Sequence, residues 1–184
     1  MMFIVEYAIL SNEKERLKKV EKIALFEEQL DEIEGQICIT CNENRIGFVD
    51  ESISYEGEFL VTWLRRLNSG ILYLDSNGYF AMLVPDSADV WLEFKLINKV
   101  VQVSKIKTTK KYKDTTMINP IESTKIFWMD NIEKTQLFQE ILKKTEAFIK
   151  EVYSVNKLLV ESRGIKRLIN IFQMAKGLLN RFVI

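Results

Sequence analysis

The chain contains no histidine, so it lacks the side chain whose ordinary pKa lies closest to neutrality. The usual serine and cysteine triads and the histidine-bearing metal sites are therefore excluded. Every other acid–base group would need a tuned environment to transfer protons at neutral pH. The seven glycines are scattered and form neither G-x-x-x-x-G-K nor G-x-G-x-x-G, so nucleotide cofactors have no support. We expect a protein that is not an enzyme and uses no cofactor.

Two cysteines, Cys38 and Cys41, have the C-x-x-C spacing that occurs in redox and zinc sites. They fall in a run typical of a β-strand, where residues three positions apart project to opposite faces. No second cysteine pair or histidine completes a tetrahedral zinc shell. We interpret both as small apolar side chains of the core, with a redox role as the alternative.

Carboxylate pairs are the remaining candidates for acid–base chemistry. Asp50-Glu51, and Asp86 with Asp89, lie in segments typical of turns. We interpret them as solvated turn residues and not as a general acid–base dyad. A small hydrolase that uses carboxylates or Cys38 is the least favoured function.

The formal net charge is zero, which argues against a general nucleic-acid-binding protein. Residues 1–60 nevertheless contain fourteen acidic and six basic residues, a net charge of −8, so the rest carries +8. Five lysines in nine positions could contact a phosphate backbone, but only one aromatic residue, Tyr112, is interleaved among them. We interpret them as solubilising an exposed edge strand and loop. The five are Lys105, Lys107, Lys110, Lys111 and Lys113.

Five acidic residues fall in the eight positions from 27 to 34. On an amphipathic helix they would form the solvent-exposed face, because Leu30 and Ile33 can still turn inward. They could also form an acidic patch complementary to a basic partner surface, and the two interpretations are compatible. A tryptophan on the more polar face of a predicted strand could anchor an interface. The candidate partner-binding residues are therefore Glu27, Glu28, Asp31, Glu32, Glu34 and Trp91.

The N-terminal part of the chain alternates strand and helix patterns. Residues 3–9 have the period of a strand, and a charged helix that begins at Ser11 is expected to end at Gly35. Residues 36–41 and 46–49 are rich in β-formers and flank a polar connection. They predict a hairpin.

The middle of the chain predicts a short helix followed by a meander. Leu60 to Leu67 has helical spacing, and Gly70 is placed to end the helix. From residue 71 to 107 the pattern is that of strands, with Asn77-Gly78 as a tight hairpin turn. Residues 79–84 are expected to form a central strand, because both faces are apolar. Residues 90–97 have one apolar face and one partly wet face.

The C-terminal part predicts a loop and two helices. Residues 108–125 are polar and read as a long loop. Asp130 and Glu133 resemble a capping box for a helix that ends near Tyr153, and a last helix covers about 165–179. The fold class is α+β, in one domain over 1–184. An antiparallel β-meander sheet carries N-terminal helices and two C-terminal helices packed on one face.

The sequence also predicts a location. Residues 1–10 are apolar, but they contain Glu6 and lack both a basic leading segment and a small-residue cleavage site. No stretch approaches the roughly eighteen apolar residues of a membrane span. Two cysteines in a chain with a sufficient core fit a reducing compartment. We expect a cytoplasmic protein without a membrane partner.

The order of the predicted segments along the chain resembles that of a known group of proteins. The segment EFLVTWLRRL (58–67) precedes the meander, and FWMD (127–130) leads into two closing helices through NKLL (156–159). In this plan, over most of its length, the chain resembles the immunity proteins that bacteria encode beside polymorphic or contact-dependent toxins.

The resemblance implies a function. Such proteins neutralise a cognate toxin in the cytoplasm by binding it and covering or distorting its active site, without catalysis. Many of the toxins are nucleases with basic grooves, which a carboxylate-rich helix could occupy. The alternative is a regulatory or structural homodimer. It would use the exposed face of the meander or an apolar tail formed by Leu178, Leu179, Phe182, Val183 and Ile184.

Overall fold

The computed structural model describes residues 2–53, 57–85 and 87–179. Its strands are β1 (Phe3–Ala8), β2 (Glu34–Cys41), β3 (Asn44–Gly47), β4 (Glu58–Phe59), β5 (Tyr79–Leu83), β6 (Val90–Ile97), β7 (Val100–Lys107), β8 (Thr116–Met117) and β9 (Lys125–Glu133). Its helices are α1 (Ser11–Lys18), α2 (Ile23–Gln29), α3 (Leu60–Asn77), α4 (Lys134–Val155), the short 3-10 helix η1 (Lys157–Glu161) and α5 (Arg163–Leu179).

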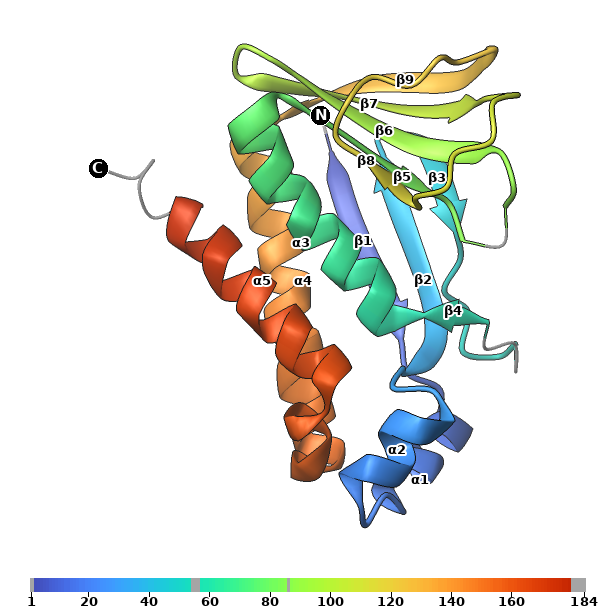
Figure 1. Ribbon diagram of the computed structural model, residues 1–184, viewed down its shortest axis with the longest axis vertical. Coiled ribbons are helices and arrows are strands. Elements are labelled where there is room, and N and C mark those ends of the chain that lie inside the picture. Colours follow the sequence, from blue (N-terminus) through green and yellow to red (C-terminus); the bar gives the residue numbers. More distant parts are fainter. Residues whose placement is uncertain (1, 54–56, 86, 180–184) are drawn as a thin grey trace.

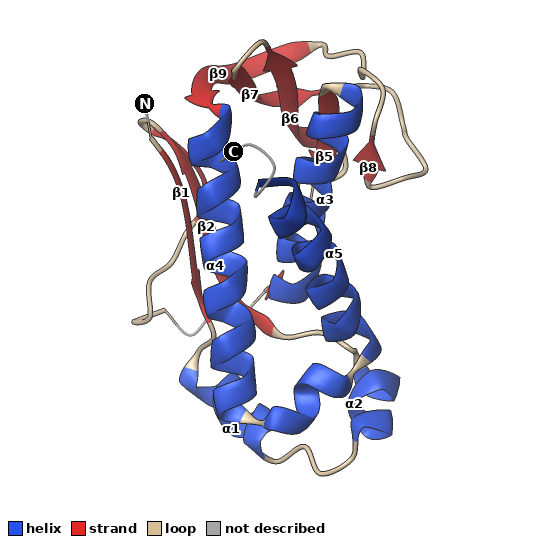
Figure 2. Cartoon of the chain, turned by 90° about the vertical axis from the view of Figure 1, so that its left-hand side faces the viewer, coloured by secondary structure: helices blue, strands red, loops and turns tan. Residues whose placement is uncertain are grey.

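The strands form two antiparallel sheets. One has the order β1-β2-β3, with β4 also paired to β2, and the other has the order β8-β5-β6-β7-β9. The five-stranded sheet lies across one end of the molecule, and α1 and α2 lie at the other end (Figure 1). Between them α3, α4 and α5 run lengthwise, with α4 next to β1 and β2 (Figure 2). The predicted α+β class, with antiparallel strands and two closing helices, is confirmed.

The main core lies between the two sheets and the long helices. It buries Trp63 of α3, Phe80 and Phe94 of the five-stranded sheet, and Phe138 and Phe148 of α4. Full burial of large apolar side chains such as these stabilises the fold by roughly 1.5–3 kcal/mol each. The β2–β3 hairpin predicted over 36–49 is confirmed, with the register Cys38 opposite Gly47.

The helix predicted to end at Gly70 is longer, and the predicted hairpin turn at Asn77-Gly78 is wrong. Helix α3 continues to Asn77, and Gly78 is its left-handed C-cap, with φ of 70°. Gly70 is tolerated inside the helix because the helix packs closely on the next strand. A Cβ added at Gly70 would lie 2.8 Å from Cδ1 of Phe80.

The single charged helix predicted from Ser11 to Gly35 is also wrong. The segment forms two short helices, α1 and α2, and Asp31 adopts a positive φ of 51° before β2 begins at Glu34. No side-chain cap stabilises the start of either helix. Contacts with distant segments therefore fix their positions.

On the outer face of the five-stranded sheet the apolar part around Trp91 is covered, whereas Lys95 on the same face stays partly exposed, as predicted. The predicted loop carries Tyr112 and Ile121 over Tyr79, Trp91 and Ile106, which together form a second apolar cluster. The hydroxyl of Tyr79 accepts a hydrogen bond from the backbone N–H of Ile121 at 3.1 Å and so fastens this loop to the sheet.

Residues 125–133 form a strand, β9, which the prediction had assigned to a loop and a helix start. The proposed capping box at Asp130 and Glu133 is therefore wrong in its first member. Glu133 itself is the N-cap of α4, and its carboxylate accepts from the N–H groups of Thr135 and Gln136. Asp130 instead accepts from the side-chain amides of Asn42 and Asn44, both at 2.8 Å, and ties β9 to the β2–β3 turn.

Candidate functional site

The predicted acidic site is used largely for helix capping. Glu32 is 6% exposed and lies beside the first turn of α3. Its carboxylate accepts from the N–H groups of Val61 at 2.7 Å and Thr62 at 3.1 Å, from the Thr62 hydroxyl at 2.7 Å, and from its own neighbour Ile33. Because Phe59 at the N-cap position has no capping side chain, Glu32 satisfies these donors from a distant segment. As a surface contact, Glu32 was predicted wrongly.

Two more acids of the run hold the start of α5. A carboxylate oxygen of Glu27 accepts from the backbone N–H of Arg163 at 2.7 Å, and its second oxygen lies 3.2 Å from the guanidinium. Asp31 accepts from the N–H of Gly164 at 3.2 Å. A Cβ at Gly164 would lie 2.7 Å from the Asp31 carbonyl oxygen, so only glycine permits this approach. Negative charge at a helix N-terminus also interacts favourably with the helix dipole.

The other predicted acids lie apart from these caps. Glu28 is exposed on α2, and Glu34 is half-buried at the start of β2. The five acids therefore do not form one continuous acidic surface. Trp91 is 2% exposed, and its ring meets Tyr112 edge-on at 5.5 Å, so it cannot act as an interface anchor. The sequence correctly predicted which face of the strand carries Trp91, but it did not predict the loop that covers this face.

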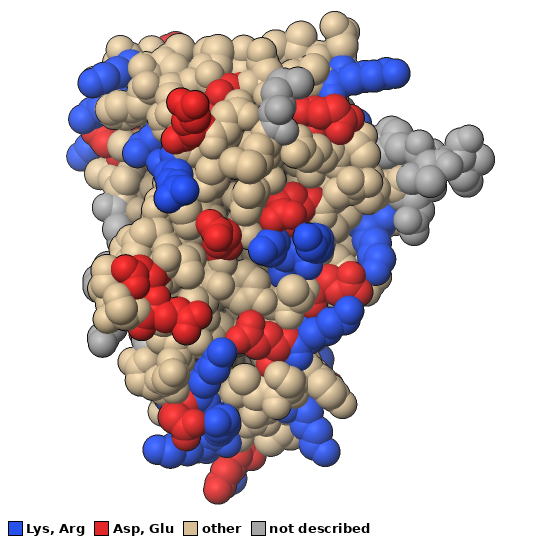
Figure 3. Space-filling view, turned by 180° about the vertical axis from the view of Figure 1, so that it is seen from behind, with Lys and Arg blue, Asp and Glu red and all other residues tan. Residues whose placement is uncertain are grey.

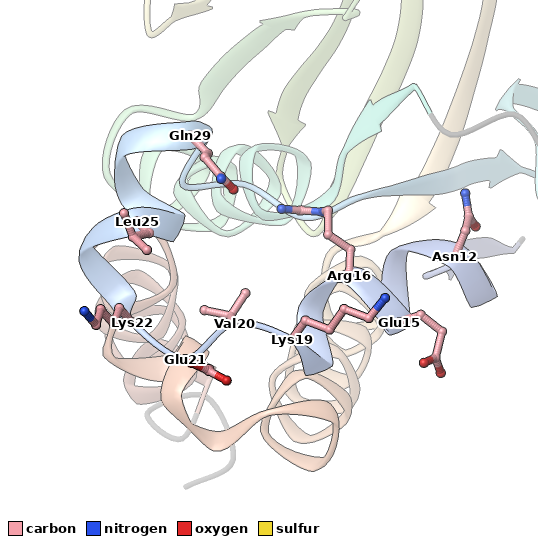
Figure 4. Close-up of a pocket in the computed structure, with 9 residues that line it drawn as sticks. All are labelled: Asn12, Glu15, Arg16, Lys19, Val20, Glu21, Lys22, Leu25 and Gln29. Atoms are coloured by element: carbon pink, nitrogen blue, oxygen red, sulfur yellow. The ribbon is translucent and has the colours of Figure 1, made fainter.

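A hollow of about 720 Å³ lies between α1 and α2 (Figure 4). Arg16 and Val20 point into it, and Glu15 points away. Arg16 is already held by Glu13, with nitrogen–oxygen distances of 2.6 and 2.7 Å. The lining residues are Asn12, Glu15, Arg16, Lys19, Val20, Glu21, Lys22, Leu25 and Gln29. The hollow is lined by both acidic and basic side chains, but these are not arranged as in a catalytic site.

The side chains that the sequence offered for chemistry have structural roles. Cys38 and Cys41 are buried free thiols, as expected for core residues, and burial raises the pKa of Cys41 to about 12. Asp50 accepts from the N–H and hydroxyl of Ser52 in a turn, and Asp89 pairs with Lys107 at 2.9 Å. Asp86 lies outside the described residues, as do Phe182, Val183 and Ile184 of the apolar tail.

Neither a metal site nor a membrane-spanning helix is present in the part of the chain that is described. No group of three or more metal-ligating side chains is placed to hold an ion among residues 2–53, 57–85 and 87–179. Within the same ranges, no helix has the length and apolar character needed to cross a bilayer.

The basic run does not lie on an edge strand as predicted. Lys105 and Lys107 belong to β7, which is paired on both sides, by β6 and β9. The other three lysines lie in the loop after β7. Viewed from behind, the surface carries acidic and basic side chains interspersed, without a large area of one sign (Figure 3). A strong electrostatic field is therefore not the feature that marks a binding surface on this face.

Strand β9 is the feature that sequence reasoning missed. It is the terminal strand of the five-stranded sheet, and no other strand of the described residues pairs with its outer side. It lies at the top margin of the molecule in Figure 1. Three large apolar side chains within four residues are exposed on it: Ile126 by 50%, Phe127 by 42% and Met129 by 45%. Isolated exposed apolar residues are ordinary, whereas a cluster on an open strand edge is typical of surfaces that contact another chain.

The Phe127 ring is placed between two cations. The ammonium of Lys125 lies 4.8 Å from the ring centroid, and that of Lys105 lies 5.6 Å from it. The ladder between β7 and β9 is irregular at Lys105/Ile106, which brings Phe127 into this position. The run of β-branched and aromatic residues Ile126, Phe127 and Trp128 could have revealed the strand, but the apparent capping box nearby favoured a helix start.

No family model, curated protein or solved structure matches this chain.

Proposed function

We propose that this chain is a non-catalytic immunity protein that neutralises a cognate bacterial toxin in the cytoplasm by direct binding. The single observation that carries the binding function is the open edge of β9 with its exposed Ile126, Phe127 and Met129. The toxin as partner follows from the resemblance of the chain to immunity proteins.

The geometry of β9 favours an extended protein segment as the docked element. In an antiparallel ladder, successive residues direct their N–H groups alternately to either side. The N–H of Lys134 bonds the Lys99 carbonyl on the β7 side, so Asn131 and Met129 direct theirs outward. A strand of the partner could pair with these groups while its side chains contact the exposed apolar residues.

The other exposed strand edges are poorer candidates. Strand β8 has two residues and β3 has four, whereas β9 has nine. In β1, the N–H of Val5 is bonded by Glu140 of α4 at 3.2 Å. Length and accessibility together select β9 among the described edges.

The test is co-expression with a toxin. An immunity gene is expected directly beside the gene of a large secreted toxin, so the C-terminal domain of that toxin should be expressed with this chain. We expect host growth to be restored and a complex to form in calorimetry. Phe127→Ala should weaken binding by roughly 30-fold, the effect of losing an interface residue worth about 2 kcal/mol.

Three further variants test whether β9 itself is the contact surface. Met174→Ala removes a side chain that is 61% exposed on α5 and should leave affinity unchanged. Glu28→Lys tests the acidic-patch hypothesis and should have little effect. Asn131→Pro removes an outward N–H and should weaken binding without unfolding the chain, since an edge strand tolerates proline. Growth that is not restored, or a Phe127→Ala variant with wild-type affinity, would contradict the proposal.

A further inference from the structure

We infer that the partner segment that docks on β9 is an extended strand with two unlike faces, acidic on the side of Phe127 and apolar on the side of Met129. The inference rests on the proposed function in one respect, that β9 is a docking edge, and it adds the kind of segment that this edge selects. The pattern follows from β9 itself, because its two faces carry different side chains.

A bulge in β9 separates the two faces. Phe127 lies between Ile126 and Trp128, the residues that pair with β7 on either side of the bulge, and has no partner residue of its own. A bulge of this kind interrupts the alternation of side chains and redirects one of them. Phe127 therefore shares a face with Lys105 and Lys125, whose ammonium groups lie 5.6 and 4.8 Å from its ring centroid.

The face that carries Phe127 is basic at this end of the sheet. Residues directly opposite each other project from the same face of a sheet. Lys105 lies opposite Leu92 of the main core, and Lys107, two positions further along β7, lies opposite Lys125. In Figure 1 this end of the sheet, where β7 finishes and β9 begins, projects to the right of the three long helices. Lys125 and Phe127 are exposed there.

The lysines of this basic face are only partly neutralised. Lys107 pairs with Asp89 at 2.9 Å. Among the described residues, no carboxylate forms an ion pair with Lys105 or Lys125, which contact the ring of Phe127 instead. Like charges directly opposite each other in a ladder repel, as Lys107 and Lys125 do. A carboxylate on a docked strand would relieve this repulsion.

The other face of β9 is apolar at its edge. Ile126 lies opposite Ile106 of the second apolar cluster, and Met129 lies opposite Ser104, two positions from Ile106 on β7. Ile126 is 50% exposed and Met129 is 45% exposed. A docked strand extends the sheet, so its own side chains alternate between the two faces. The segment that fits therefore alternates apolar residues with acidic ones.

A protein segment fits this edge better than a nucleic acid does. Single-stranded nucleic acid stacks its bases on exposed aromatic rings, but two ammonium groups already lie over the ring of Phe127. The outward backbone groups of Met129 and Asn131 can pair with a strand, as in other cases of β-strand addition. An acidic strand uses both the backbone groups and the lysines of the edge.

Synthetic peptides test the pattern on the purified full chain. They have nine residues, the length of β9, with valine at alternate positions and glutamate, serine or lysine at the others. Each peptide carries a fluorophore, and its affinity is measured by anisotropy. We expect the glutamate peptide to bind about fivefold more tightly than the serine peptide, the effect of a few exposed ion pairs, and the lysine peptide to bind most weakly. Added salt should weaken the glutamate peptide more than the serine peptide.

Substitutions on the two faces separate charge from apolar contact. Lys125→Glu should weaken the glutamate peptide by about fivefold and strengthen the lysine peptide. Met129→Asn should weaken all three peptides by a similar factor, because it removes an apolar contact that they share. The matched control is Lys143→Glu, which reverses an exposed lysine on α4 and should leave every affinity unchanged. The unfolding transition of each variant is measured alongside.

Four results would overturn the inference. The first is binding of the serine or lysine peptide as tight as that of the glutamate peptide, or of none of them below about 1 mM. The second is a glutamate peptide whose affinity Lys125→Glu leaves unchanged. The third is tighter binding of a thymidine oligomer, which would make the lysines a nucleic-acid surface.

The fourth is a wild-type chain that is dimeric in sedimentation equilibrium and becomes monomeric with Met129→Asn, which would make a second copy the occupant of the edge. None of these measurements uses a toxin. The selectivity for acidic strands can therefore fail while toxin neutralisation is confirmed, and the converse can also be observed.

Discussion

Replacement of Glu32 by alanine tests whether this carboxylate stabilises the fold by capping α3 or instead serves to contact a partner. The substitution leaves the buried N–H of Val61 and the part-buried N–H of Thr62 without their acceptor. Each unsatisfied buried donor costs about 1–3 kcal/mol. Loss of negative charge at the start of α3 adds about 0.3–1 kcal/mol. Relief of the desolvated carboxylate offsets part of this, so we expect a net destabilisation of about 2–4 kcal/mol.

Urea unfolding, followed by tryptophan fluorescence and far-UV circular dichroism, measures the change. Glu28→Ala is the matched control, because Glu28 belongs to the same acidic run but is exposed. It should alter the free energy of unfolding by less than about 0.5 kcal/mol. A Glu32→Ala variant as stable as the control would refute the capping argument.

The pH dependence gives an independent check with Glu32→Gln. Burial raises the pKa of Glu32 above its ordinary value of 4.5, although its hydrogen bonds act in the opposite direction. In the unfolded chain the carboxyl ionises at that lower value, so the unfolded state loses its proton first. As the pH rises from 4.5 through the folded pKa, the stability advantage of wild type over Glu32→Gln should therefore fall and then level off. An advantage that grows over this window would show that the hydrogen bonds outweigh burial.

Two further predictions concern residues that the fold makes unusual. Gly70→Ala should destabilise the chain by about 1–3 kcal/mol because its Cβ would meet the Phe80 ring, whereas Gly177→Ala, with open space around it, should stabilise α5 by up to about 1 kcal/mol. Both are read from thermal unfolding, and equal effects of the two substitutions would contradict the packing argument. Cys38 and Cys41 should not react with a thiol reagent at pH about 8 until urea unfolds the chain, and fast reaction in the native state would revive a redox role.

Local sequence patterns were sufficient to predict the elements that are stabilised mainly by residues close in the sequence. The hairpin of β2 and β3, the apolar strand β5 and the closing helix α5 were predicted near their observed bounds. In each case the alternation or helical spacing of apolar residues coincides with the side that the core buries. Such elements need no information from distant parts of the chain.

The predictions failed where a distant segment decides the structure. Gly70 ends a helix by local rules, but here its missing Cβ makes room for Phe80 of the next strand. The acids at 27–34 form an apparent binding surface, yet the donors that use Glu32 and Asp31 lie 29 and 133 residues further along the chain. No periodicity within the acidic run encodes those partners. The open edge of β9 was likewise invisible, because it depends on which strand ends the sheet.

The two ends of the molecule differ in what a partner would have to displace. At the hollow between α1 and α2, Arg16 is already bound by Glu13, so a charged ligand must compete with an existing pair. At β9 an incoming strand only replaces water on the outward backbone groups, and each exchange gains about 0.5–1.5 kcal/mol. Burying Phe127 or Met129 fully would gain roughly 1.5–3 kcal/mol per side chain, less the part already buried. In the proposed complex the backbone of β9 would therefore set the orientation of the docked strand, and its apolar side chains would decide the affinity.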